Sequence, residues 1–306
     1  MRRIGERAGR RRSAADAAAR REGRAHARLV LEERRRRSAW RRRAALAGQA
    51  GGAGLLVAEG DSWFDYPFFD LVGELEGVFG YDVESVAHRG DTVEEMAYDP
   101  AQLDGLARRL EKLASHGRRP KAILLSGGGN DIAGDTFVML LNHKRSALAS
   151  WSAPVLDGVI SQRIRSAVAF LASAITELCR AHFGSPRIPI LVHGYDYPVP
   201  DGRGYLGGFW LMPGPWLEPG FRRKSYLDLA ERCALMRGLI DRFNEMLAGL
   251  AGGPGLEHLH HVDVRGALSS ALAGKAYKAW WNDELHPTEK GFVEVARRFD
   301  AVLRAL

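Results

Sequence analysis

Short runs of mostly apolar residues alternate with longer amphipathic stretches along most of the chain. The short runs are typical of buried strands, because they span only four or five residues and stop at loop-forming residues such as Gly, Ser and Asp. The longer stretches repeat apolar residues every three or four positions, which predicts helices. The predicted strands are 55–58, 82–86, 121–125, 188–192 and 260–264. The predicted helices are 68–78, 103–115, 160–183, 226–250 and 288–306.

The alternation of strand and helix predicts the α/β class. Five short strands separated by helices favour a three-layer α/β/α domain, doubly wound around a mainly parallel five-stranded sheet. In such domains the ligand sites lie beyond the carboxyl ends of the strands. The residues that directly follow each predicted strand are therefore the first candidates for chemistry.

Charge divides the chain into two parts. Residues 1–50 contain 17 arginines, no lysine and five acidic residues, a local charge of +12, so that the net +7 leaves −5 for the rest. We therefore predict an Arg-rich extension at 1–48, partly helical or disordered, and a globular domain at 49–306. The extension is either a solvated arm or an arm that binds a polyanion, such as nucleic acid or an anionic membrane surface, since clustered arginines pair with phosphate.

Composition narrows the class of protein further. The 306 residues are 46% apolar and 26% charged, as in soluble globular proteins. Cys179 and Cys233 are too few for a disulfide framework or a thiolate metal site, so we expect reduced cysteines in the core. No run approaches the ~18 apolar residues of a membrane span. Arginines at 41–43 followed by a weakly apolar run could suggest a secretory signal peptide, but cleavage there would remove the first predicted strand. We therefore expect no signal peptide and a cytoplasmic location.

Ser62 follows the first predicted strand, in the sequence EGDSW. One interpretation is a helix N-cap, a position that favours serine. The other is a nucleophile, which needs a neighbouring base to take its proton. His286 is the candidate base, and Asp283 lies three residues before it, so a tight turn can bring its carboxylate to the imidazole Nδ1.

Two further strand ends offer hydrogen-bond donors for an oxyanion. Gly90 follows the second predicted strand, and its backbone N–H is open to close approach because glycine has no Cβ. Asn130 follows the third strand and offers a side-chain amide. With the N–H of Ser62, these are the parts of an oxyanion hole, in which each donor contributes roughly 2.7–4 kcal/mol to catalysis.

Together these residues resemble the GDSL-type, or SGNH, serine hydrolase family. The resemblance covers about residues 54 to 306, and the four blocks occur in the family's order. They are GDS at 60–62, the loop glycine Gly90, GGND at 128–131 and DELHP at 283–287. The resemblance implies a flavodoxin-like fold, Ser62 as nucleophile, His286 as base, Asp283 as its orienting partner, and Ser62, Gly90 and Asn130 as the oxyanion hole.

The function implied is an esterase or lipase that cleaves carboxylic esters of small acyl or lipid-like substrates through an acyl-enzyme. It needs no metal and no organic cofactor, and the nearby His258, His260 and His261 are interpreted as ordinary strand-edge residues. A lysophospholipase or thioesterase is a close variant. One alternative is a carbohydrate O-deacetylase of the same family. Another is a binding protein on a hydrolase scaffold, brought to nucleic acid or membrane by its Arg-rich arm.

The residues that differ from the family pattern are candidates for substrate binding. Trp63 replaces the usual leucine after GDS and begins an aromatic cluster, which either lines an acyl or aryl pocket or packs in the core. Arg89, beside Gly90, either favours anionic substrates or is solvated.

A Gly- and Pro-rich stretch, 195–221, follows the fourth predicted strand and is too apolar for an ordinary solvated loop. We predict a lid or wall over the site, with packing on the body or a subunit interface as the alternative. Its candidate substrate-binding residues are Phe209, Trp210 and Trp216, and Trp281 extends the same wall from the stretch before Asp283.

Overall fold

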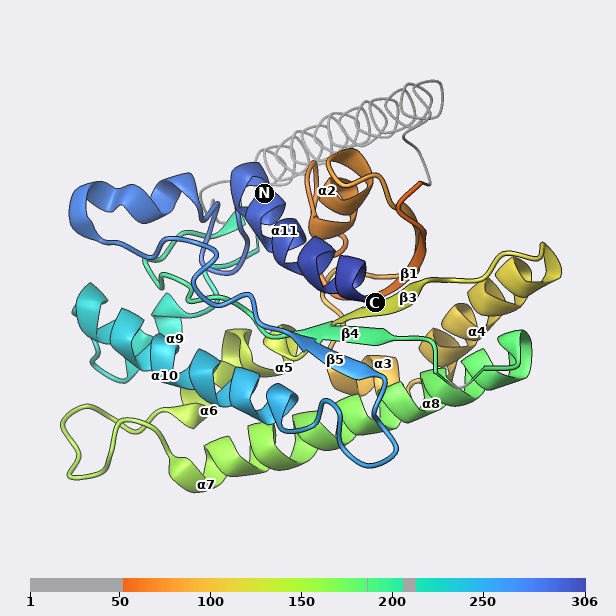
Figure 1. Ribbon diagram of the computed structural model, residues 1–306. Coiled ribbons are helices and arrows are strands. Elements are labelled where there is room, and N and C mark those ends of the chain that lie inside the picture. Colours follow the sequence, from red (N-terminus) through yellow and green to blue (C-terminus); the bar gives the residue numbers. More distant parts are fainter. Residues whose placement is uncertain (1–51, 186, 206–212) are drawn as a thin grey trace, which may run out of the picture. The chain divides into compact units, whose positions relative to one another are not determined.

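The computed structural model describes residues 52–185, 187–205 and 213–306 (Figure 1). By its internal contacts the chain divides into two units, Met1–Gln49 and Ala50–Leu306, and the described residues all belong to the second. The predictions for the Arg-rich extension, and for Phe209 and Trp210, concern residues outside these ranges.

Five strands form one sheet in the order β2-β1-β3-β4-β5, and every neighbouring pair is parallel. The predicted parallel five-stranded sheet is confirmed. Because β2 lies on one side of β1 and β3 on the other, the chain changes direction there, and a crevice opens beyond the carboxyl ends of β1 and β3. The strands are β1 (Leu55–Gly60), β2 (Asp82–Ser85), β3 (Ala122–Ser126), β4 (Ile190–His193) and β5 (Leu259–Val262).

Helices cover both faces of the sheet, which makes the predicted three layers (Figure 1). One face carries α2 (Leu71–Gly77) and α11 (Glu289–Ala305). The other carries α3 (Val93–Tyr98), α4 (Pro100–Ser115), α8 (Arg165–Phe183) and α10 (Leu229–Ala248). Shorter helices include α5 (Gly129–Ile132), α6 (Phe137–Leu140), α7 (Ala153–Leu156) and α9 (Glu218–Arg223).

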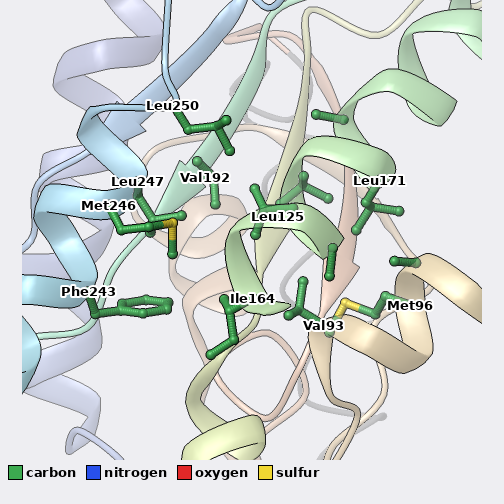
Figure 2. Packing of buried hydrophobic residues seen from close by; sticks show 14 of the residues in the cluster. Val93, Met96, Leu125, Ile164, Leu171, Val192, Phe243, Met246, Leu247 and Leu250 are labelled. Carbon is green, nitrogen blue, oxygen red and sulfur yellow. The ribbon is translucent and has the colours of Figure 1, made fainter. Parts of the chain in front are cut away.

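The alternation of side chains along β1 explains the two cores. Val57 packs into the cluster under α3, α4, α8 and α10, whereas Leu56 and Ala58 pack into the cluster under α2 and α11. Figure 2 shows part of the first cluster, where Leu125 of β3 and Val192 of β4 lie among side chains of the covering helices. A strand buried on both faces needs the nearly continuous apolar sequence seen here.

Several element ends differ from the sequence prediction for local reasons. Helix α2 begins at Leu71, three residues after the predicted start, because Phe68 has a φ of +77° and the Asp70 carboxylate accepts a bond from Gly73 N at 2.6 Å as N-cap. The predicted helix 160–183 begins inside a π-helical stretch, Asp157–Ile164, which runs directly into α8. Among the residues described, no helix combines the length and the apolar character needed to cross a bilayer.

Candidate active site

Ser62 lies in a tight turn beyond the carboxyl end of β1. Asp61 N extends the pairing with β3 by donating to Ser126 O at 3.0 Å, and then Phe64 N donates back to Asp61 O at 3.0 Å. Because Asp70 is the N-cap of α2, Ser62 caps no helix in the described chain. The interpretation of Ser62 as an N-cap is therefore wrong.

Asp283 and His286 share a second turn, residues 281–287, which we call the catalytic turn. Trp281 and Pro287 form an isolated antiparallel bridge at its base, and Asn282 N donates to His286 O at 2.8 Å. Asp283 Oδ1 accepts from the backbone N–H of His286 at 2.8 Å. The three-residue spacing thus folds the carboxylate back onto the imidazole, as the sequence predicts.

The two turns bring Ser62, His286 and Asp283 into one hydrogen-bonded line. Ser62 Oγ lies 2.8 Å from His286 Nε2, and His286 Nδ1 lies 2.9 and 3.0 Å from the two Asp283 oxygens. A carboxylate only accepts, so Nδ1 carries the proton and Nε2 accepts from the serine hydroxyl. Asp283 is fully buried, and burial alone favours a higher pKa. The His286 imidazole and the other hydrogen-bond donors to the Asp283 carboxylate nevertheless hold its pKa below the usual value.

The aromatic ring of Tyr66 covers the imidazole. The ring centroids of Tyr66 and His286 are 4.2 Å apart with an interplanar angle of 24°, and Tyr66 Oη donates to Asp283 Oδ2 at 2.8 Å. In the sequence, Tyr66 is one of the aromatic residues in the cluster that begins at Trp63. Nothing in the local pattern separates it from its neighbours, because its contact with Asp283 joins residues 217 positions apart.

A buried polar network fixes the turn that carries Ser62. The Asp61 carboxylate accepts from Trp63 N at 3.0 Å and Ser126 Oγ at 2.7 Å, and also from Tyr195 Oη. Tyr195 Oη in turn accepts from Gly129 N at 3.1 Å, so one hydroxyl joins the turn of Ser62 to the start of α5. All of this is enclosed by protein, where charged hydrogen bonds are stronger than in water.

Two of the three predicted oxyanion donors, Asn130 and Gly90, lie in different surroundings. Asn130 lies at the start of α5 and lines the same cavity as Ser62 and His286, with Nδ2 donating to Asp91 O at 2.9 Å. An amide nitrogen carries two N–H groups, so a second is available to a ligand. Gly90 lies in an exposed turn after β2 with a φ of +93°, a conformation that glycine adopts without strain.

A largely apolar cavity opens beside the serine and the histidine. Its walls come from α5, from α10, from the segment before α9 and from the catalytic turn, so they lie on the side of the sheet where α10 packs. The lining includes Ile132, Leu217, Met236, Leu239, Ile240, Phe243, Trp281 and Leu285. Such a wall removes apolar groups of a ligand from water and offers few polar contacts.

The four described candidates for substrate binding differ in placement. Trp63 is 2% exposed and packs on His193 in the core, while also lining the cavity, so both interpretations of it apply. Trp281 lines the cavity from the catalytic turn, and Trp216 meets His286 edge-on with centroids 5.5 Å apart. Arg89 is 52% exposed, lies outside the cavity lining and pairs with Asp65 at 3.3 Å, which favours the solvated interpretation.

Glu284 ties the Gly- and Pro-rich segment to the catalytic turn. Its side chain is fully buried and accepts four backbone N–H bonds from the two ends of that segment. Burial raises the pKa of Glu284 to about 7, although the four donors act in the opposite direction. In the opposite direction, from the Gly- and Pro-rich segment to the catalytic turn, Arg203 Nη1 donates to Trp281 O and Asn282 O at 2.9 Å. The four amides are those of Gly202, Trp216, Leu217 and Glu218, at 2.8–3.1 Å.

The nearby histidines have structural partners. His258 Nε2 lies 2.7 Å from Thr176 Oγ1, and His261 Nε2 lies 3.0 Å from Asn244 Oδ1. His258 directly precedes β5, and His260 and His261 lie within it. Within the described ranges, no three His, Cys, Asp or Glu side chains gather in a way that suits a metal ion.

Comparison with known proteins finds similar folds only among solved structures. No family model matches the chain, and no curated protein matches it. A GDSL-like lipase from Bacteroides thetaiotaomicron is 13% identical, covers 87% of this chain and 98% of its own, and has a TM-score of 0.42. An acetylxylan esterase from Geobacillus stearothermophilus is 14% identical, with 83% and 95% covered and a TM-score of 0.41. An α/β hydrolase enzyme from the Lake Arreo metagenome is 17% identical, with 84% and 97% covered and a TM-score of 0.40.

Proposed function

We propose that this chain is a serine hydrolase that cleaves carboxylic esters of small acyl or lipid-like substrates through an acyl-enzyme. The observation that carries this proposal is the hydrogen-bonded line from Ser62 Oγ through His286 to Asp283, at the mouth of an apolar cavity. Nucleophile, base and orienting carboxylate are the three groups that activate a serine hydroxyl.

In acylation, Ser62 Oγ attacks the ester carbonyl carbon while its proton passes to His286 Nε2. The carbonyl π electrons move onto oxygen, and the resulting oxyanion is stabilised by the Ser62 N–H, the Gly90 N–H and the Asn130 amide. Asp283 stays ionised and steadies the imidazolium at Nδ1. When the intermediate collapses, the C–O bond to the alcohol breaks, and His286 gives its proton to the leaving oxygen.

In deacylation, a water molecule takes the place of the alcohol. His286 Nε2 removes a proton from water as the hydroxide attacks the acyl carbon, and the same donors stabilise the second oxyanion. Collapse breaks the bond to Ser62 Oγ, which takes back the proton from His286. The products are a carboxylic acid and an alcohol, and the enzyme returns to its starting state.

The cavity lining supports an acyl group as the part of the substrate that binds beside Ser62. Met236, Leu239 and Ile240 of α10 face it with hydrocarbon. Each buried CH₂ contributes about 0.8 kcal/mol, so kcat/KM increases about fourfold for each CH₂ that fits. A sugar ring needs many polar partners, whereas most of this lining is hydrocarbon, so we place the carbohydrate O-deacetylase second.

The first test is hydrolysis of p-nitrophenyl esters from acetyl to palmitoyl by the wild type and by Ser62→Ala. We expect kcat/KM to increase with chain length up to one optimum and then decrease. We expect Ser62→Ala to decrease kcat/KM at least about 10³-fold at every chain length. Met236→Trp fills part of the cavity, and we expect it to move the optimum to shorter chains while acetyl-ester cleavage is retained.

The outcomes separate the candidates. A maximum at acetyl, together with release of acetate from acetylated oligosaccharides, favours the deacetylase. Activity on thioesters or lysophospholipids that exceeds activity on aryl esters favours those variants. Equal cleavage by the wild type and Ser62→Ala would refute the mechanism. A wild type inert on all of these substrates favours the binding-protein alternative, and loss of DNA or vesicle binding on deleting residues 1–48 would support it.

A further inference from the structure

Tyr66 makes two different contacts with the proposed acid–base pair, and the inference drawn from them rests on the proposed function. The side chain is 4% exposed and lies four residues after the nucleophile. Its hydroxyl reaches Asp283 and its ring lies on His286. One residue thus contacts both the carboxylate and the imidazole, from an element distant in sequence.

The direction of the Tyr66 hydrogen bond is fixed by a third residue. Asn282 Nδ2 donates to Tyr66 Oη at 2.9 Å, so the phenol oxygen is already an acceptor there. Its own proton therefore points to Asp283 Oδ2, 2.8 Å away. Burial, followed by the charge of Asp283, raises the pKa of Tyr66 well above its usual value, so the phenol stays protonated and remains a donor.

The ring of Tyr66 is held in place by other aromatic side chains. Tyr205 meets it edge-on with centroids 5.8 Å apart, and Phe69 lies against it at 5.6 Å. With one face toward His286, the ring presents π electrons to the imidazole at the moment when that imidazole gains charge. The ring also keeps water from that face of the base.

We propose that Tyr66 is a positioning residue for catalysis, whose hydroxyl restrains the Asp283 carboxylate and whose ring orients and covers the His286 base. The hydroxyl shares the negative charge of Asp283 Oδ2, which limits how strongly the carboxylate attracts the imidazolium.

Among the described residues, few other titratable groups face the pair. From the surrounding segments, Tyr205 interacts electrostatically with Asp283. From the catalytic turn itself, Glu284 points to the Gly- and Pro-rich segment, where its four backbone donors lie. Arg203 binds the backbone carbonyls behind the turn. None of these groups is altered when only the Tyr66 hydroxyl is removed.

The experiment separates hydroxyl from ring. Tyr66→Phe removes the hydrogen bond and keeps the stacked ring, whereas Tyr66→Leu removes both. The matched control is Tyr81→Phe, because Tyr81 is also 4% exposed and also donates to a carboxylate, Asp300 Oδ1 at 3.0 Å, away from the site. The readouts are the pH profile of kcat/KM on the best p-nitrophenyl ester and, separately, kcat and KM.

For Tyr66→Phe we expect kcat to decrease about five- to tenfold with KM within about twofold. We expect the pH of half-maximal kcat/KM on the acid side to move up by about 0.5 to 1 pH unit, because the unrestrained carboxylate holds the imidazolium more strongly. In Tyr66→Leu we expect kcat to be about two- to fivefold lower again than in Tyr66→Phe. Tyr81→Phe leaves kcat and the pH profile unchanged.

An NMR titration makes the inference independent of activity. The ring Cε1–H signal of His286 is identified by its absence in His286→Gln, and its titration midpoint is expected to move up in Tyr66→Phe. If Tyr66→Phe does not fold, Asn282→Ala, which leaves the phenol less directed, is expected to move the midpoint the same way by less. An unmoved midpoint, or equal losses in Tyr66→Phe and Tyr81→Phe with no change in pH profile, overturns the proposal. A moved midpoint in a chain that cleaves no ester refutes the proposed function and supports the role of Tyr66.

Discussion

The carboxyl ends of β1 and β2 lie side by side but are held in different ways. Beyond β1, the Asp61 carboxylate is 2% exposed and accepts three hydrogen bonds under the turn of Ser62. Beyond β2, the turn of Gly90 is exposed, and Arg89 beside it forms an ion pair with Asp65. The proposed nucleophile is therefore fixed by buried polar bonds, whereas the turn of the proposed oxyanion glycine is held in part by exposed contacts, such as Arg89 N to Asp65 Oδ2 at 3.2 Å.

The largest expected effect comes from removing the buried hydrogen bonds beyond β1. Asp61→Ala leaves Ser126 Oγ, Tyr195 Oη and an amide without their acceptor, so the free energy of unfolding is expected to decrease by about 3 to 5 kcal/mol. Asp65→Ala, the matched change on the exposed side, is expected to cost less than about 1 kcal/mol. Urea unfolding followed by circular dichroism measures both. Equal losses would show that the two ends are held alike.

The next largest effect concerns Asn130, which joins the two sides through its bond to Asp91 O. For Asn130→Ala we expect kcat to decrease about 10²- to 10³-fold, or about 2.7–4 kcal/mol in the activation barrier, with a smaller change in KM. The control is Asn142→Ala, because Asn142 Nδ2 also donates to a backbone carbonyl, at 2.8 Å, away from the cavity. A loss confined to KM would assign Asn130 to binding instead of to the oxyanion.

The smallest effect is a dependence of stability on pH at the end of β1. Burial and then the charge of Asp91 raise the pKa of Glu59 from 4.5 to about 8. Between these values the folded chain holds a proton that the unfolded chain has lost, so this contribution to stability decreases as the pH rises through 8. Between pH 6 and pH 8 the loss is about 2 kcal/mol. We expect the free energy of unfolding, measured at each pH, to show this decrease in the wild type and not in Glu59→Gln. An identical dependence on pH in the two proteins would contradict the assignment to Glu59.

Much of the fold follows from local sequence. Strands β1, β3 and β4 were predictable because they are short, mostly apolar runs, and β1 and β3 end at residues such as Gly60 or Gly127, which favour loops. Their ends were less predictable, since β5 begins at Leu259 and stops at Val262, where pairing with β4 ends. Helix α2 began later than predicted because of the conformation of Phe68, which apolar spacing does not report.

The line formed by Ser62, His286 and Asp283 was anticipated because each residue belongs to a short motif at a strand or helix end. Tyr66 and Tyr195 belong to no such motif, and Glu284 lies inside DELHP without a role assigned to it there. Their partners lie between 66 and 217 residues away along the chain. Their hydrogen bonds form only when folding brings these distant segments together.

The sequence by itself determined the order of elements, the parallel sheet and the candidate residues at its carboxyl edge, because hydrophobic period and motif spacing act over a few residues. Only the tertiary structure decided which side chains support that edge. A buried hydroxyl or carboxylate must find its partner among all the groups that burial brings together, and that pairing depends on the packing of α10, α11 and the catalytic turn against the sheet.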